Sequence, residues 1–268
     1  MENEFPFDPK DSIVVIAPHP DDETLGVGGL IYEARLRQIP VSVIYFTSGD
    51  GNRVGTMQWS KRPLPRPHHY KAYAKLREQE AIRALSVLGI AAENSYFPAF
   101  PDQGLKQLST PKYRKKLYRS PYTRATHTAG SIPHTGEALT DYVRAKLLQL
   151  SPTIILLPMT EDSHTDHRAA GKLIRQIARG LPYPTQLYAY PIHYRFFPKP
   201  RGINPNLLLN IPRHHPLASQ WSTVGLSPAA VMAKSEAVEC YASQLRIPLL
   251  DVLMRSLVRK NELLLPLK

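Results

Sequence analysis

The sequence predicts an α/β protein with a Rossmann-like, doubly wound, mostly parallel sheet and helices on both faces. Apolar, mostly β-branched runs alternate along the chain with amphipathic stretches of helical spacing, an order typical of parallel sheets. The runs at 12–17 and 153–159 are continuously apolar, as expected of strands that are covered on both faces. No internal repeat or low-complexity linker interrupts this order, which indicates one domain over residues 1–268.

The elements can be assigned in order along the chain. We expect strands at 12–17, 41–47, 94–100, 153–159 and 185–192, and helices at 23–38, 69–89, 136–150 and 166–180. Two of these helices end at a glycine, Gly89 and Gly180. The rest of the chain predicts an edge hairpin that includes 206–212 and helices near 228–244 and 248–264. The "GVGG" at 26–29 lies inside the first helix, which favours close packing of helix on sheet over a dinucleotide site.

Composition limits the class of protein. The chain has 268 residues, of which 43% are hydrophobic and 21% charged, enough for a substantial globular core. No apolar run approaches the length of a membrane span, and the first residues lack the basic and apolar regions of a signal peptide. The single cysteine, Cys240, permits no internal disulfide. These features predict a cytoplasmic protein, with long loops at about 48–70 and 101–135.

Positive charge is concentrated in two of the loops. The formal net charge is +12, and the stretches 61–71 and 106–124 hold much of the excess. This excess is compatible with an anionic substrate, a nucleic acid or a membrane surface. Tyrosines are interleaved with basic residues in the second stretch, but no nucleic-acid module surrounds it. A solvated loop face is therefore favoured, and no specific nucleic-acid partner is expected. The extra loops also offer surface for a homo-oligomer.

A group of ionisable residues follows the first predicted strand. The motif "PHPDDE" at 18–23 puts His19, Asp21 and Asp22 where the strand gives way to a helix. His19 and Asp22 are three residues apart, so their side chains can face one point in a helical turn, and Asp21 can reach it from the side. In open α/β sheets, ligands bind outside the carboxyl ends of the strands. Imidazole and carboxylate are ordinary ligands of Zn²⁺.

A second group follows the strand predicted at 153–159. The motif "SHTDH" at 163–167 contains His164, Asp166 and His167, again just before a helix. Two strand ends that are distant in sequence therefore present histidine and carboxylate to the same edge of the sheet. The alternative is that the carboxylates merely cap helices. Capping requires one carboxylate and no histidine, so a metal site is favoured.

The two motifs together resemble those of the PIG-L/LmbE-type zinc-dependent de-N-acetylases. Further segments agree with this resemblance: "TSGDG" at 47–51, "REQEAIRALSVLG" at 77–89, "PDQGL" at 101–105 and "KSEAVECYASQ" at 234–244. The resemblance implies a Rossmann-like fold in which zinc is held by His19, Asp22 and His167. A different divalent transition metal could replace zinc, because His₂Asp sites accept several ions.

The resemblance also implies roles for residues beside the metal. It makes Asp21 the general base, His164 the residue that polarises the substrate carbonyl, and Asp166 the carboxylate that supports His164. Arg77 and Asp102 match positions that hold the sugar. Each of these two has a structural alternative: Arg77 could pair with Glu80 on the same helix, and Asp102 could be a turn residue.

The implied activity is that of a metal-dependent amidohydrolase that removes an N-acetyl group from an amino sugar or glycoconjugate. Zinc-bound hydroxide would attack the acetyl carbon, Asp21 would accept the proton of the water, and zinc with protonated His164 would stabilise the oxyanion. The positive loops favour an anionic substrate. Two alternatives remain: a metal-dependent esterase (an O-deacetylase) on the same scaffold, and a non-catalytic sugar- or nucleic-acid-binding protein.

Overall fold

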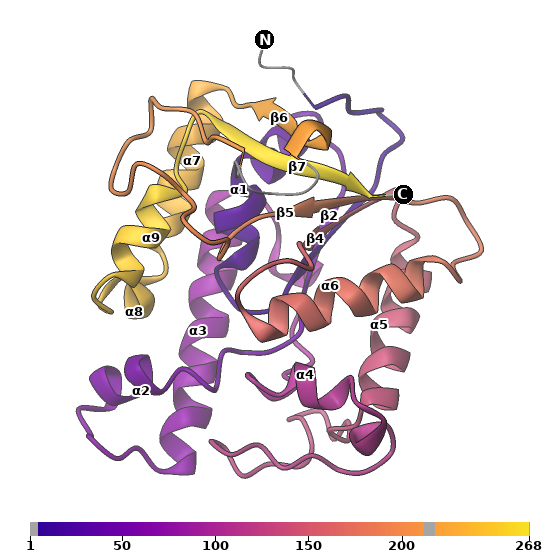
Figure 1. Ribbon diagram of the computed structural model, residues 1–268, viewed down its shortest axis with the longest axis vertical. Coiled ribbons are helices and arrows are strands. Elements are labelled where there is room, and N and C mark those ends of the chain that lie inside the picture. Colours follow the sequence, from indigo (N-terminus) through magenta and orange to yellow (C-terminus); the bar gives the residue numbers. More distant parts are fainter. Residues whose placement is uncertain (1–4, 212–217, 268) are drawn as a thin grey trace.

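A seven-stranded sheet forms the centre of the computed structural model, which describes residues 5–211 and 218–267. The strands, in spatial order, are β3 (Ser95–Tyr96), β2 (Val41–Tyr45), β1 (Ile13–Ala17), β4 (Ile154–Pro158), β5 (Gln186–Tyr190), β7 (Asn261–Leu267) and β6 (Ser222–Gly225). The pairs from β3 to β5 are parallel, and β7 pairs antiparallel with both β5 and β6. The predicted mostly parallel α/β sheet is confirmed (Figure 1).

Helices cover both faces of this sheet, and the residues of β1 alternate between the two sides. Ile13, Val15 and Ala17 pack in one core, with α1 (Asp22–Leu36), α3 (Pro67–Val87), α7 (Pro228–Glu239) and α9 (Leu250–Ser256). Val14 and Ile16 pack in the other, with α4 (Leu105–Leu108), α5 (Gly136–Leu150) and α6 (Thr165–Ala178). Figure 1 shows the first group of helices mainly to the left of the strands and α5 to the right.

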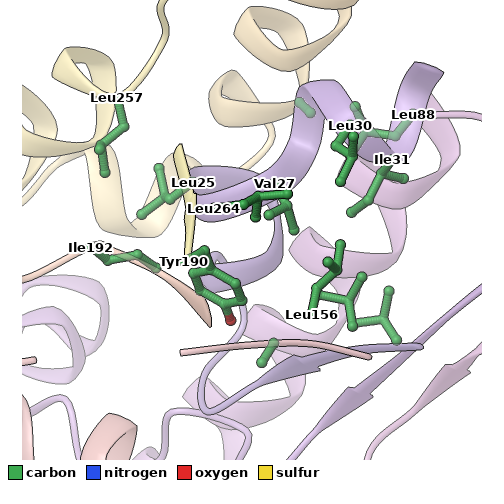
Figure 2. Packing of buried hydrophobic residues seen from close by; sticks show 14 of the residues in the cluster. Leu25, Val27, Leu30, Ile31, Leu88, Leu156, Tyr190, Ile192, Leu257 and Leu264 are labelled. Atoms are coloured by element: carbon green, nitrogen blue, oxygen red, sulfur yellow. The ribbon is translucent and has the colours of Figure 1, made fainter. Parts of the chain in front are cut away.

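Helix α1 packs closely on the sheet. Figure 2 shows Leu25 and Val27 of α1 near Tyr190 of β5 and Leu264 of β7. The Tyr190 hydroxyl donates a hydrogen bond to the Ile16 carbonyl at 2.6 Å. A β-carbon on Gly26 would come within 2.3 Å of the Tyr190 ring, so only glycine allows this approach. The "GVGG" segment therefore serves close helix–sheet packing.

A buried ion pair is inserted into a kink of α1. At Val27 the backbone leaves helical geometry (φ −143°, ψ 22°). The backbone N–H groups of Gly29 and Leu30 donate to the Glu262 carboxylate at 2.8 and 2.9 Å, in place of carbonyls of α1. The Lys234 ammonium donates to the Leu25 carbonyl at 2.9 Å and lies 2.7 Å from Glu262. Residues from α7 and β7 thus complete the hydrogen bonding of the kinked helix.

Several predicted elements differ in the structure. The predicted strand at 206–212 is absent over 206–211, and Pro212 lies outside the described residues. The antiparallel edge is instead formed by β6 and β7, which are separated in sequence by α7, α8 (Ala242–Leu245) and α9. The helix predicted at 248–264 ends at Ser256, because the following leucines pair with neighbouring strands. The strand predicted at 94–100 has only two residues, β3.

The predicted loops contain short helices. The loop at 48–70 includes α2 (Arg53–Ser60) and the start of α3, and the loop at 101–135 includes α4. Single 3₁₀ turns occur at Ala92–Asn94, Pro111–Tyr113 and Ala218–Gln220. Over residues 5–211 and 218–267, no helix combines the length and the apolar composition that crossing a bilayer requires.

The strand order identifies the functional edge of the sheet. From β1 the chain adds β2 and β3 on one side, then returns to place β4 and β5 on the other. In doubly wound sheets, ligands bind at the carboxyl edge where the order reverses, here between β1 and β4. The first motif immediately follows β1, and the second follows β4 after four residues.

Candidate metal centre and active site

The first motif forms the turn between β1 and α1. The Asp22 side chain folds back onto His19: Oδ2 accepts a hydrogen bond from the His19 backbone N–H at 2.8 Å and lies 3.1 Å from Nδ1. Asp21 precedes the helix with a φ of 123°, an unfavourable value for a residue other than glycine, and its side chain makes no capping bond. Helix capping therefore does not account for Asp21 or Asp22.

The second motif forms the turn between β4 and α6. His164 precedes the helix, and its Nδ1 accepts a hydrogen bond from the Asp166 backbone N–H at 3.3 Å. The Asp162 carboxylate accepts from the backbone N–H groups of His164 at 2.7 Å and His193 at 3.0 Å, and lies 3.1 Å from Nδ1 of His167. Asp162 therefore ties the segments that follow β4 and β5 to His167.

The two turns meet at Asp22. Its Oδ2 lies 3.1 Å from Nε2 of His167 and 3.1 Å from Nδ1 of His19. The ring centroids of His19 and His167 are 5.4 Å apart, and that of His164 is 4.7 Å from His19. His19, Asp22 and His167 are buried. The sequence motifs thus converge on one point, as the strand-end rule predicts.

The donor atoms of this cluster fit a metal ion. Among the described residues, sets of donors that lie within 4.8 Å of one another are His19, His164 and His167; Asp22, His167 and His193; and His19, Asp102 and Asp166. Ligand atoms about 2 Å from one tetrahedral ion lie about 3.3 Å apart, and Asp22 Oδ2 lies 3.1 Å from one nitrogen of His19 and 3.1 Å from one of His167. The predicted triad of His19, Asp22 and His167 is not itself one of these sets, although two of the sets each contain two of its members. Among the described residues, Nε2 of His167 is buried and has no hydrogen-bond partner. A bound metal would supply the partner that this buried nitrogen needs.

Each of the two histidines beside Asp22 also faces a second carboxylate. Nε2 of His19 lies 3.1 Å from Asp102, and Nδ1 of His167 lies 3.1 Å from Asp162. Metal-ligating histidines almost always have such an outer partner, which orients the ring. Although burial acts in the opposite direction, the His167 imidazole lowers the pKa of Asp162 to about 2.

The carboxylates of Asp102 and Asp166 both face His19. Asp102, expected to hold the sugar, is buried against His19. Asp166, expected to support His164, accepts from the Gln103 backbone N–H at 2.7 Å and lies 3.7 Å from Nε2 of His19. Its contact with His164 is made by its backbone N–H. Both carboxylates therefore lie behind His19.

Arg77 contacts Asp21. Its Nη2 lies 3.0 Å from Asp21 Oδ2 and donates to the Pro20 carbonyl, and both side chains are buried. The alternative partner Glu80 instead accepts hydrogen bonds from Ser243 at 2.8 and 2.6 Å. Burial raises the pKa of Asp21 to about 7, although Arg77 acts in the opposite direction. Arg77 thus pairs with the candidate base and not with Glu80, and its predicted contact with the sugar stays a prediction.

The His164 ring faces the cluster, and one backbone hydrogen bond fixes its Nδ1. Burial and the positive charges of His19 and His167 lower the pKa of His164 to about 3. Because Nδ1 accepts a hydrogen bond from Asp166, the neutral ring is assigned its proton on Nε2. This leaves an Nε2–H that can donate to a carbonyl oxygen, and the protonated His164 expected from the sequence stays a prediction.

Sequence reasoning assigned no functional role to three residues of this site. The His193 ring lies 5.0 Å from that of His167. It follows β5, so the strand-end rule that identified the motifs could also have found it. Asp162 makes the contacts with His167 described above. Asp50, taken as a turn residue, is buried and accepts from the Asp102 backbone N–H at 2.9 Å.

Comparison with known proteins agrees with the family resemblance that the two motifs indicate. The family model described as PIG-L, GlcNAc-PI de-N-acetylase, matches residues 14–178. A deacetylase of 1D-myo-inositol 2-acetamido-2-deoxy-alpha-D-glucopyranoside from Nocardia farcinica is 34% identical over 73 residues, 27% of this chain and 24% of that protein. A probable N-acetyl-alpha-D-glucosaminyl L-malate deacetylase 2 from Bacillus subtilis is 37% identical over 82 residues, 30% of this chain and 34% of that protein. The matched segments thus span about a quarter and a third of these relatives.

The fold is also similar to that of solved structures. The N,N'-diacetylchitobiose deacetylase of Pyrococcus horikoshii superposes with a TM-score of 0.62 at 16% identity, over 97% of this chain and 87% of that one. At this identity the similarity concerns the fold alone.

Proposed function

Because this chain belongs to the PIG-L family of GlcNAc-PI de-N-acetylases, we propose that it hydrolyses the acetamide of an N-acetylglucosamine derivative. The products are acetate and a free amino sugar. The observation that carries this proposal is the convergence of His19, Asp22 and His167 on one point, with Asp21 beside it, at the reversal between β1 and β4.

We assign His19, Asp22 and His167 as the ligands of a divalent metal, with zinc as the ion expected for this donor set. Such an ion, when bound, acts as a Lewis acid that lowers the pKa of water and polarises a carbonyl. Asp102 and Asp162 orient the two ligand histidines from their outer sides.

Asp21 is the proposed general base. It is next to Asp22 in the chain, and its contact with Arg77 fixes the position of the carboxylate. Asp21 accepts a proton from the water that adds to the acetyl carbon. The same proton then passes to the nitrogen as the C–N bond breaks, so the sugar leaves with a neutral amine and the acetyl group leaves as acetic acid, which ionises to acetate by giving its proton to solvent.

His164 is the proposed donor to the substrate carbonyl. Its Nε2–H donates to the carbonyl oxygen as negative charge develops there, while the Asp166 backbone N–H holds the ring through Nδ1. A donor of this kind is typically worth about 3–4 kcal/mol of transition-state stabilisation.

The proposed substrate class follows from what the relatives share. One relative is named for an inositol glycoside and another for an L-malate glycoside, and both names specify an N-acetylated glucosamine unit. We propose that this unit is the part hydrolysed here and that the attached group, the aglycone, differs. No specific nucleic-acid partner is proposed.

The test is acetate release from a panel of N-acetylglucosamine glycosides, using zinc-loaded protein with Asp21→Asn as the matched control. Release that the substitution abolishes supports the proposal. Release from O-acetyl esters but from no amide would favour the esterase alternative. Absence of release from every compound, with zinc demonstrably bound, would contradict the proposed activity.

A further inference from the structure

The backbone of Asp21 is held in an unfavourable conformation. Its φ of 123° and ψ of −28° lie in a region that residues other than glycine rarely adopt. Such a conformation persists only where the surrounding groups determine it. Because Asp21 is the proposed base, the contacts that hold its backbone decide where the base lies.

Asp21 is held at two points. Arg77 pairs with its carboxylate, with 3.0 Å between Nη2 and Oδ2. At the other point, the Asp21 backbone N–H donates a hydrogen bond to Oε2 of Glu23 at 3.2 Å. A first-turn glutamate can make such a bond simply to cap the helix. Glu23, however, is fully buried, and the cost of burying a carboxylate exceeds what one capping bond returns. Capping alone therefore does not explain Glu23.

Glu23 is bound by a tyrosine from a distant part of the chain. Its Oε1 accepts hydrogen bonds from the Tyr241 hydroxyl and from the Thr24 hydroxyl, the latter at 2.6 Å. Tyr241 is 218 residues away in the sequence and is also buried. Over the described part of the chain, neither lysine nor arginine forms an ion pair with Glu23. Hydrogen-bond donors alone therefore compensate for the burial of this carboxylate, and Tyr241 fixes its position.

The segment that carries Tyr241 also supports Arg77. Tyr241 lies between α7 and α8. Two residues later, Ser243 donates to the Glu80 carboxylate through its backbone N–H at 2.8 Å and through its hydroxyl at 2.6 Å. Glu80 follows Arg77 by about one turn on α3. Residues 241–243 therefore contact both supports of Asp21, since they bind Glu23 and also the helix that presents Arg77.

We propose that Tyr241 is a positioning residue for the general base and that it acts through Glu23. This inference rests on the proposed function, which makes Asp21 the base. Without the Tyr241 hydroxyl, Glu23 loses the donor that ties it to the C-terminal part of the chain, and the Asp21 backbone loses a fixed acceptor. Arg77 alone then determines where the Asp21 carboxylate lies. A displacement of about 1 Å at a reacting group can lower the rate about 100-fold.

The first experiment compares Tyr241→Phe with the wild type in acetate release from N-acetylglucosamine glycosides. Because the ring is kept, kcat is expected to fall about 10- to 100-fold, while KM and zinc affinity stay within about threefold of the wild-type values. Tyr190→Phe is the matched control, since it removes another buried hydroxyl, the one bonded to the Ile16 carbonyl. Its kcat should stay near that of the wild type. Equal kcat values for the two variants overturn the proposal.

A double variant tests the route through Glu23. Glu23→Gln keeps the size of the side chain but cannot accept from the Asp21 backbone and both hydroxyls as the carboxylate does. If Tyr241 acts through Glu23, this variant should lower kcat by a similar factor, and adding Tyr241→Phe to it should lower kcat little further. Losses that multiply in the double variant overturn the proposed route.

Crystal structures separate the position of Asp21 from the chemistry, because they require no turnover. In Tyr241→Phe, the hydrogen bond from the Asp21 backbone to Glu23 should be lost, and the Asp21 carboxylate should shift by about 1 Å relative to the candidate metal ligands. This result supports the positioning role even if the wild type hydrolyses no acetamide, in which case only the proposed function fails. An unchanged Asp21 overturns the role, even in an active enzyme. Glu23→Gln provides the same measurement if Tyr241→Phe does not fold.

Discussion

The Asp102 carboxylate lies 3.1 Å from Nε2 of His19, on the ring edge opposite the one that meets Asp22. His167 has the same arrangement, with Asp22 on one edge and Asp162 on the other. Each candidate ligand histidine is therefore held between two carboxylates. This arrangement fixes the orientation of each ring before any metal binds.

Removing an outer carboxylate should weaken metal binding while leaving all three ligands in place. Asp162→Asn is expected to lower zinc affinity about 10- to 100-fold, because His167 loses the partner of Nδ1. Competition with a chromogenic chelator measures this affinity. Glu161→Gln is the matched control, since this neighbouring acid is exposed. Equal affinities for the two variants would remove Asp162 from the proposed metal centre.

Asp21→Asn should separate metal binding from turnover. The amide keeps the size of the side chain but cannot accept the proton of water, so kcat is expected to fall about 10²- to 10⁴-fold. Metal content, measured by mass spectrometry, should remain one ion per chain. Near-normal turnover in this variant would show that another group is the base.

The two residues of the ion pair in the kink of α1, Lys234 and Glu262, should contribute unequally to the free energy of unfolding. Lys234→Met leaves a buried carboxylate that still accepts two backbone hydrogen bonds, with an expected cost of about 3 kcal/mol. Glu262→Leu should cost more, since it leaves the ammonium and both N–H groups without their acceptor. Urea unfolding measures both values.

The control for this comparison is Glu239→Gln, which removes the exposed pair with Arg255 and should change the free energy of unfolding by less than about 1 kcal/mol. A smaller loss for Glu262→Leu than for Lys234→Met would contradict the proposed role of the carboxylate in the helix.

His134 should make the fold sensitive to acid. Burial lowers the pKa of its imidazole to about 4, and among the described residues neither ring nitrogen has a hydrogen-bond partner. Below pH 6.5 the unfolded chain binds a proton at this residue that the folded chain does not. The contribution of neutral His134 to the free energy of unfolding is therefore fully present above pH 6.5 and is lost as the pH falls toward 4. The slope for one proton is about 1.4 kcal/mol per pH unit.

The test compares wild type with His134→Leu by urea unfolding at several values between pH 4 and 7. The free energy of unfolding of the variant should fall less steeply with decreasing pH, by up to about 1.4 kcal/mol per pH unit. Parallel curves would mean that His134 binds its proton equally in both states.

The parts of this molecule that sequence predicts well depend on local patterns. The helix expected at 136–150 is found as Gly136–Leu150, where Thr135 caps its first turn. The convergence of His19 with His167 also followed from sequence, because parallel strands bring their carboxyl ends to one edge.

The parts that sequence misses depend on distant partners. Leu263, Leu264 and Leu265 suit a helix equally well, and only pairing with β5 and β6 makes them a strand. Likewise Arg77 and Glu80 have the spacing of a helical pair, yet each is drawn to a residue far away in the chain, Asp21 and Ser243. Spacing along one helix cannot reveal such competition.

The dependence of the first helix on Glu262 has a consequence for biosynthesis. The kink at Val27 lies a few residues after Asp21 and Asp22, but its backbone donors, Gly29 and Leu30, find their acceptor on β7, 233 and 232 residues later in the chain. A nascent chain that already displays both catalytic motifs outside the ribosome still lacks this acceptor. Completion of this turn therefore requires β7 to have been synthesised, and a chain shortened before Glu262 should carry both motifs yet lack the acceptor that holds the kinked helix.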